Sequence, residues 1–214
     1  MSNTIFGEND DETNLSVKDA SLLLIYFGQF IDHDITLVEV HNATVDHGNR
    51  ADIKVPLGDP IFDRDGHGNA FIPFGRSEHD RDDKGVRAFR NSQTPWLDLS
   101  QVYGTEKHIS DQLRANNGEG KLKMTYIDGN EMLARNKDVH VELEHNSDHS
   151  FACGDIRCNE HPLSLTTLFA REHNRLAEHF KRLYPEDGDD LLFHKARLAN
   201  IQQYQQVFEL IITM

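Results

Sequence analysis

Apolar residues recur at helical spacing in the first part of the chain. The apolar residues that recur at steps of three or four before residue 32 are Ala20, Leu23 or Leu24, Phe27, and Phe30 or Ile31. This spacing gathers apolar side chains on one face and predicts a buried helix that ends near Ile31. Ser16-Val-Lys-Asp19 has the spacing of a capping box, with Asp in place of Glu, so we expect the helix to start there.

A second helical pattern begins at Ser164 and must end before Pro185, because proline cannot continue a helix. Its periodic residues are Leu165, Leu168, Phe169, His173, Leu176, Phe180 and Leu183. Asp189 or Asp190 can cap a last helix from Leu191 to about Ile212. The chain stops inside that element, so we expect the domain to be cut at its C-terminus.

The middle of the chain lacks such periodicity. Residues 41–90 are rich in Gly, Asp, Pro and His and predict a long, loop-dominated excursion. We expect Thr105 to cap a short helix, about Glu106 to Ala115, and residues 121–150 to form short strands and turns. With no internal repeat or domain boundary, the fold class is mainly α, with long loops and little β structure, in a single partial domain over residues 1–214.

Composition excludes several classes of function. The 214 residues carry a net charge of -14, which argues against binding to nucleic acid or anionic membranes. The longest apolar stretch, Leu22 to Phe27, is too short to span a bilayer, and the N-terminus of this chain lacks a signal peptide. Cys153 and Cys158 are the only cysteines, and either a local disulfide or two thiols fits their spacing.

Three groups of residues carry candidate chemistry. On a helix, Gln29, Asp32 and His33 project from one face, where they are either used chemically or form a solvated helix end. Alternating residues of an extended segment share one side, where their oxygens suit calcium or simply face water; these are Thr94, Trp96, Asp98 and Ser100. Arg157 and Glu160 lie three residues apart before a helix. Arg157 either supplies a fixed positive charge to a reactive site or forms an ordinary ion pair.

Two metal motifs can be rejected. The segment Asp63-Arg-Asp-Gly-His-Gly68 begins like an EF-hand loop, but its twelfth position is Phe74 instead of glutamate. The thirteen histidines occur in no H-E-x-x-H motif, and the cysteines form no C-x-x-C pair. His173, His179 and His194 fall on expected helices, as core or solvent-facing residues.

Five segments in order resemble the animal haem peroxidases, the family of myeloperoxidase, peroxidasin and peroxinectin. They are Gly28-Gln-x-x-Asp-His-Asp34, Ile72-Pro-Phe-x-Arg-Ser77, Thr94-x-Trp-x-Asp-x-Ser100 with Val102-Tyr-Gly104, Arg157-x-x-Glu160, and Leu168-x-x-Arg-Glu-His-Asn-Arg-Leu-Ala177. The resemblance implies haem b and calcium as cofactors. It also implies that hydrogen peroxide is reduced while halides or small organic donors are oxidised.

The resemblance also implies residue roles. His33 would move the proton of peroxide, Arg157 would stabilise the developing charge, and Gln29 would position the peroxide. Asp32 and Glu160 would form ester links to haem, while His161 replaces the methionine of a third link. Calcium would be held by Asp34, Thr94, Trp96 through its carbonyl, Asp98 and Ser100.

The family's proximal histidine lies downstream of the last resembling segment, so we expect a domain truncated at both ends, with a second chain as one source of that histidine. By family, we expect a secreted protein that responds to oxidative stress. Two alternatives remain open: a non-catalytic, adhesion-type relative that binds calcium or haem, and a gene fragment without function of its own.

Overall fold

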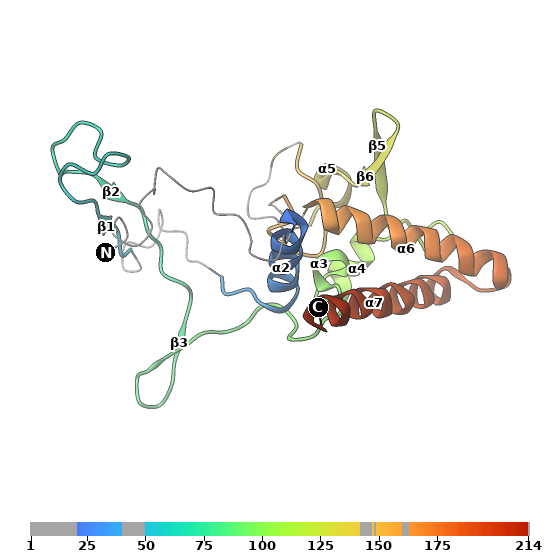
Figure 1. The fold of residues 1–214 in the computed structure, drawn as a ribbon. Helices are drawn as coiled ribbons and strands as arrows, with labels where there is room; N and C mark the ends of the chain where they lie inside the picture. Colours follow the sequence, from blue (N-terminus) through green and yellow to red (C-terminus); the bar gives the residue numbers. More distant parts are fainter. Residues whose placement is uncertain (1–20, 40–49, 142–146, 148, 160–162, 214) are drawn as a thin grey trace.

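The chain folds into a body of helices from which one long loop region projects (Figure 1). The computed structural model describes residues 21–39, 50–141, 147, 149–159 and 163–213. The helices in these residues are α2 (Leu22–Ile35), α3 (Ser100–Tyr103), α4 (Lys107–Leu113), α5 (Asn136–Val139), α6 (Leu163–Leu183) and α7 (Asp189–Thr213). The expected mainly α fold is confirmed, and no helix in these segments is long and apolar enough to cross a membrane.

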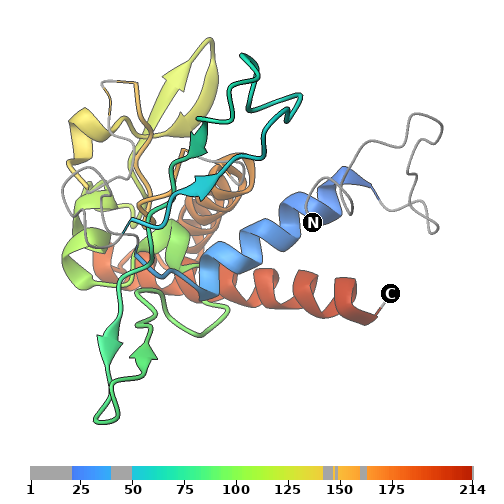
Figure 2. The same ribbon diagram turned by 90° about the vertical axis from the view of Figure 1, so that its left-hand side faces the viewer.

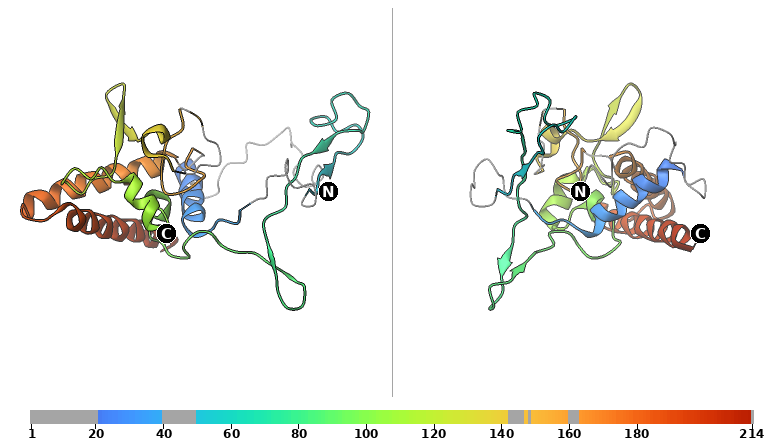
Figure 3. Two further views of the ribbon diagram at one scale, coloured as in Figure 1. Left: turned by 180° about the vertical axis from the view of Figure 1, so that it is seen from behind. Right: turned by 60° about the vertical axis from the view of Figure 1, so that its left-hand side comes forward.

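The strands of the described segments form three short antiparallel pairs. These are β1 (Ile53–Lys54) with β2 (Phe71–Ile72), β3 (Asp80–Arg81) with β4 (Arg87–Ala88), and β5 (Met124–Ile127) with β6 (Asn130–Leu133). The first two pairs lie in the expected loop excursion, which extends away from the helices in Figures 1 and 3. In the third pair, Asp128 and Gly129 have φ of 50° and 78°, as a two-residue hairpin turn requires.

Helix α2 differs from the expected buried helix. It continues to Ile35, and its first turns are open to solvent, since Leu23 and Leu24 of the expected buried face are 60% and 46% exposed. Only its second half is packed, through Phe27 and Phe30. The capping box expected at residues 16–19 lies outside the described residues.

The short helix and the last helix start differently from expectation. Glu106, not Thr105, is the N-cap of α4. Asp189 lies within the first turn of α7, where its Oδ1 accepts hydrogen bonds from the backbone N–H groups of Gly118 and Gly120, both at 2.9 Å. The Arg114 guanidinium donates to both Asp189 and Asp190 at 2.6 Å. These acidic residues therefore attach the start of α7 to the loop that follows α4, and they do not cap α7.

An aromatic cluster joins α2, α6 and α7, which lie against one another in Figure 2. The Phe30 ring lies 5.3 Å from that of Phe169 and 5.6 Å from that of Tyr204, and Phe27 lies 6.1 Å from Tyr204. Each such pair contributes about 0.5–1.5 kcal/mol beyond the burial of its area. This cluster fixes the half of α2 that carries the candidate site.

A buried polar network links α3, α6 and α7. His173 Nε2 lies 3.0 Å from the carbonyl oxygen of Gly120, which can only accept, so this nitrogen carries the hydrogen. His173 Nδ1 therefore accepts from the Tyr103 hydroxyl at 3.0 Å, and Asn200 Nδ2 donates to that hydroxyl at 2.8 Å. Burial lowers the pKa of His173 to about 4, so the residue is a neutral part of the core.

Residues 152–158 form a tight loop that packs on α3. Cys153 and Cys158 are joined by a disulfide, with their Cα atoms 5.7 Å apart, which is one of the two states left open by the sequence. The Gly154 N–H donates to the Gln101 carbonyl at 2.9 Å. A Cβ atom on Gly154 would collide with the backbone nitrogen of Gly104 and the carbonyl oxygen of Ser100. Only glycine allows the loop to lie this close to α3.

We predict that His173 makes folding sensitive to acid. Its pKa is about 4 in the folded chain and 6.5 in the unfolded one, so the unfolded chain binds more protons between these values. Stability contributed by the neutral imidazole is complete above pH 6.5 and is lost as the pH falls toward 4. The stability difference between wild type and His173→Gln should shrink by about 3 kcal/mol from pH 7 to pH 4.

Urea unfolding at several pH values measures this difference. His179→Gln is the matched control, since His179 lies on the same helix and is exposed. A wild-type to His173→Gln difference that is constant with pH would contradict the assignment.

Gly154→Ala should lower the free energy of unfolding by about 1–3 kcal/mol, because the new methyl group meets backbone atoms that cannot rotate away. Gly28→Ala is the control: a Cβ there meets nothing within 4 Å, and alanine in a helix should add about 1 kcal/mol. Urea unfolding compares the two variants. Equal stability of Gly154→Ala and wild type would show that the loop can move off α3.

Candidate functional site

The last two turns of α2 carry four candidate residues. The His33 and Asp34 side chains are buried, whereas Gln29 and Asp32 are exposed. Gln29 Nε2 lies 2.7 Å from His33 Nε2, so these two side chains share a face as expected. An amide nitrogen can only donate, so in this arrangement His33 Nε2 accepts and the proton of the neutral ring is on Nδ1. Asp32 accepts a hydrogen bond from the Thr36 hydroxyl at 3.1 Å.

Arg157 reaches the same end of α2 from the disulfide-closed loop. Its Nη2 donates to the carbonyl oxygens of His33, at 3.1 Å, and Thr36, at 2.9 Å. Asp155 accepts from Nε and from the same Nη2, with Nε–Oδ1 at 3.0 Å and Nη2–Oδ2 at 2.7 Å. The positive group thus lies at the C-terminal end of the helix, where the helix dipole favours it. Nη1 has no hydrogen-bond partner among the described residues.

The five residues expected to hold calcium gather beside this turn. The Ser100 hydroxyl lies 2.9 Å from the Asp34 carbonyl oxygen and 3.2 Å from Asp34 Oδ1. The Thr94 hydroxyl lies 2.9 Å from Asp98 Oδ1 and 3.4 Å from the Trp96 carbonyl oxygen. Asp98 Oδ1 also accepts the Ser100 N–H at 3.2 Å. The structure therefore brings two carboxylates, two hydroxyls and a carbonyl into one cluster.

The segment that supplies four of these residues is bent and not extended. The expectation that they share one side of an extended segment is therefore wrong. Leu99 has φ of 57°, a left-handed conformation rare for leucine, and its N–H donates to Asp34 Oδ2 at 3.2 Å. This bend turns the Ser100 side chain toward α2. Local strain of this kind is tolerated where surrounding contacts fix the backbone.

Burial shapes the electrostatics of the cluster. Desolvation, followed by the charge of Asp98, raises the pKa of Asp34 to about 6. Burial, with the charge of Asp34, also raises the pKa of Tyr204. The Tyr204 hydroxyl has no partner in hydrogen-bonding geometry among the described residues. In those residues no three His, Cys, Asp or Glu side chains form a metal site, so hydroxyls and a carbonyl must complete any coordination.

Sequence reasoning missed two buried residues of this region. Gln93 Nε2 donates to Asp155 Oδ2 at 2.7 Å, and Gln93 Oε1 accepts from the Ser100 hydroxyl at 3.1 Å. Asp155 could have been suspected from its place two residues before Arg157, whereas no pattern marks Gln93. Glu160 and His161 lie outside the described residues.

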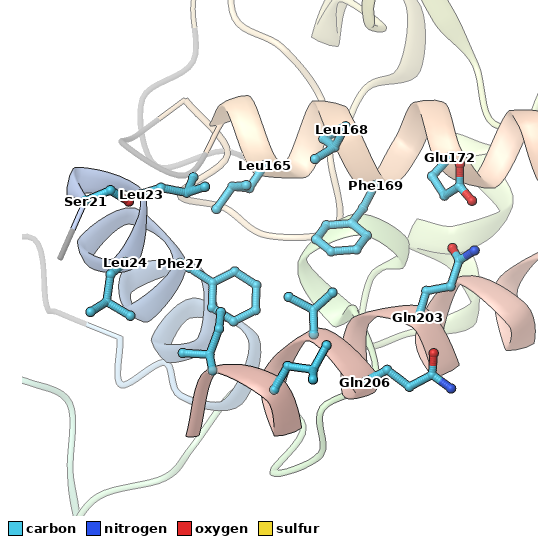
Figure 4. A pocket seen from close by; sticks show the side chains of 13 residues that line it. Ser21, Leu23, Leu24, Phe27, Leu165, Leu168, Phe169, Glu172, Gln203 and Gln206 are labelled. Carbon is cyan, nitrogen blue, oxygen red and sulfur yellow. The ribbon is translucent and has the colours of Figure 1, made fainter. Parts of the chain in front are cut away.

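Two other places hold no candidate chemistry. In the loop that resembles an EF-hand, Asp63 accepts the N–H groups of Gly58 and Gly68 at 2.8 Å and 2.9 Å and so closes a turn. A cavity of about 710 Å³ lies between α2, α6 and α7. Figure 4 shows the side chains that line it, most of them apolar, such as Phe27 and Leu168. His33 and Arg157 do not line it.

Known proteins are similar to this chain in sequence and in fold. Residues 1–209 match the family model described as animal haem peroxidase. Peroxinectin A of Dictyostelium discoideum is 31% identical over 226 residues, which cover 97% of this chain and 40% of that protein. Dual oxidase 1 of Canis lupus familiaris is 30% identical over 207 residues, covering 90% of this chain and 13% of that protein.

Solved structures agree with this. Peroxidase A from Dictyostelium discoideum has a TM-score of 0.78 and 29% identity, over 92% of this chain and 41% of that one. Fatty acid alpha-dioxygenase of Arabidopsis thaliana, at 21% identity and a TM-score of 0.66, shares the fold. The chain spans less than half the length of these relatives. By the family match, the shared sequence and the shared structure, it belongs to the animal haem peroxidases, a family of haem-binding oxidoreductases.

Proposed function

We propose that this chain forms the distal side of a haem peroxidase that reduces hydrogen peroxide and oxidises halides or small organic donors. The observation that carries the proposal is the meeting of His33 and Arg157 at the end of α2, from positions 124 residues apart. The guanidinium of Arg157 is held at the backbone carbonyl of the residue that carries the imidazole, so the end of α2 offers both a proton acceptor and a fixed positive charge. An adhesion module has no need of this pair.

His33 is suited to proton transfer. Its buried ring presents an unprotonated Nε2 that Gln29 contacts at 2.7 Å. Hydrogen peroxide that replaces Gln29 as the partner of Nε2 would give its proton to this nitrogen. The same nitrogen would then return the proton to the leaving oxygen, which is general acid–base catalysis. Gln29 would orient the peroxide as it enters.

Arg157 is suited to charge stabilisation. Asp155 and the two helix carbonyls hold Nε and Nη2, which fixes the plane of the guanidinium. Nη1 is left to donate toward negative charge that develops as the oxygen–oxygen bond breaks. Because the donor is already fixed, no reorganisation is needed at that moment.

The residues fit a haem on this side. The exposed Gln29 and Asp32 lie on the open face of the turn that carries His33, and Asp32, with Glu160, is a candidate for ester links to haem. When bound, haem supplies the redox-active iron. His173 cannot be its axial ligand, since both ring nitrogens are engaged in the core. We infer that the proximal histidine comes from polypeptide outside these 214 residues, for which a second chain is one source.

The cluster around Asp34 fits calcium as a second cofactor. Its donors are all oxygens, from Asp34, Thr94, Trp96, Asp98 and Ser100, and calcium prefers such hard ligands. A cation would offset the repulsion between the Asp34 and Asp98 carboxylates. Because Asp34 follows His33, the ion would hold the turn that carries the distal histidine.

The Cys153–Cys158 disulfide supports an oxidising compartment, and we propose secretion as the family resemblance implies. A role in the response to oxidative stress is part of the same proposal, since peroxide is the substrate.

The catalytic proposal is tested with haem added to the purified chain, without free imidazole, because imidazole in solution could replace the proton acceptor that His33→Ala removes. Haem uptake is followed by the Soret band and turnover by oxidation of a phenol with hydrogen peroxide. His33→Ala should lower the rate about 10²- to 10⁴-fold, because the proton acceptor is lost. The control is His79→Ala, in the projecting loop region. Equal rates in His33→Ala and wild type would contradict the assigned role.

Cation binding is tested by terbium luminescence. Trp96 is the single tryptophan of the chain, and a Tb³⁺ ion in the cluster would be excited by energy transfer from its ring. Asp98→Asn should weaken Tb³⁺ binding at least about tenfold, and Ca²⁺ should displace the ion. Asp63→Asn makes the same charge change in the projecting loop region and should leave binding unchanged. If both variants bind as wild type does, the ion is held elsewhere.

A further inference from the structure

A continuous line of hydrogen bonds connects the Asp34 cluster with Arg157. From Ser100, which contacts Asp34, the line passes to Gln93 at 3.1 Å, from Gln93 to Asp155 at 2.7 Å, and from Asp155 to Arg157 at 2.7 Å and 3.0 Å. Gln93 spans the gap between two segments that are 62 residues apart in sequence. We call Ser100, Gln93, Asp155 and Arg157 the relay.

The direction of each bond in the relay is fixed by chemistry. The Asp155 carboxylate can only accept, so the Gln93 amide must turn its nitrogen toward Asp155 and its oxygen toward Ser100. That oxygen can only accept, so the Ser100 hydroxyl donates to it. Flipping the amide would place an oxygen against the carboxylate and leave both without a hydrogen. The orientation of the Gln93 amide is therefore fixed by its two partners.

Ser100 is the point at which a cation would act on the relay. Its hydroxyl has one hydrogen and three acceptors within reach: the Asp34 carbonyl oxygen at 2.9 Å, Asp34 Oδ1 at 3.2 Å and Gln93 Oε1 at 3.1 Å. A cation in the cluster would draw on the oxygen lone pairs of Asp34. The hydroxyl hydrogen would then be directed more fully to Gln93, which tightens the next bonds.

The surroundings hold the relay rigid. Gln93 is 7% exposed, Asp155 is 3% exposed, and Ser100 is fully buried, so water cannot readily replace a broken bond. The disulfide brackets Asp155 and Arg157, and Gly154 packs against the backbone of α3. A shift of Ser100 would therefore be transmitted to the loop of residues 152–158, which carries Arg157.

We propose that Gln93 and Asp155 are positioning residues that couple cation binding at the Asp34 cluster to the orientation of Arg157. The proposal rests on the proposed function, since it gives the cation a second effect on the peroxide site besides holding His33. Coupling between two sites is reciprocal. A change at Arg157 must therefore alter cation affinity, and only while Gln93 is present to carry it.

A double-mutant cycle on the 214-residue chain tests this without haem. The Tb³⁺ dissociation constant is measured for wild type, Gln93→Leu, Arg157→Lys and the double variant. Arg157→Lys keeps the charge but loses the paired contacts with Asp155, and it should weaken Tb³⁺ binding about fivefold. In the Gln93→Leu background, the same change should have no further effect.

Gln101→Leu is the matched control background. Gln101 is also a buried glutamine, but its Nε2 donates to the Phe30 carbonyl at 2.6 Å and it does not contact Asp155 through its side chain. Arg157→Lys should keep its fivefold effect there. Thermal unfolding checks that each variant is folded, and Gln93→Met replaces Gln93→Leu if the latter unfolds.

A second readout follows Arg157 directly. Addition of Ca²⁺ should slow hydrogen exchange of the Arg157 Nε–H, measured by NMR on arginine-labelled protein, in wild type but not in Gln93→Leu. Equal effects of Arg157→Lys in wild type and Gln93→Leu would overturn the relay and leave the cation site intact. Failure of wild type to bind Tb³⁺ or Ca²⁺ would overturn both, while the haem test of His33 would stand apart.

Discussion

The buried carboxylate of Asp34 is the group on which the candidate site depends. A carboxylate taken out of water is costly unless hydrogen bonds or a cation compensate it. Here Leu99 N–H and the Ser100 hydroxyl reach its oxygens, and this is possible only because the chain bends at Leu99. The requirement to satisfy one carboxylate thus places residues 94–100 against α2.

The same end of α2 offers carbonyl oxygens that the helix cannot satisfy by itself. Arg157 takes those of His33 and Thr36, and Asn91 Nδ2 donates to that of Ile35 at 2.8 Å. Two segments that are distant from α2 in sequence, around Asn91 and Arg157, therefore satisfy the end of the helix, and one of them also supplies a candidate site residue. The contacts that end α2 therefore also hold the Arg157 guanidinium at the backbone carbonyl of His33.

How far the sequence anticipates this structure depends on whether an element is determined locally. The apolar period of residues 165–183 marks α6 because one face of that helix packs on the core. The end of α2 was placed too early, since the polar run from Asp32 to Asp34 breaks the pattern while long-range contacts continue the helix. The same pattern predicts burial of Leu23 and Leu24, which are exposed, because periodicity shows which face is apolar and not what covers it.

The candidate residues were found by type and order, whereas their geometry was not. An alternating pattern suggested that Thr94 to Ser100 share one side of a strand, yet a bend gathers them instead. Gln93 carries no signal, because a glutamine next to a loop is unremarkable until its partner 62 residues away is known. Contacts of this kind depend on the whole fold and cannot be derived from local spacing.

The sequence separations within the site have a consequence for how the chain folds. The bonds from Ser100 to Asp34 and from Arg157 to His33 close segments of 66 and 124 residues. Such closures are slow, because chain entropy must be lost before any contact repays it. The pair α6–α7 is joined by a short turn and can form early, so we expect the candidate site to be among the last parts of the domain to assemble.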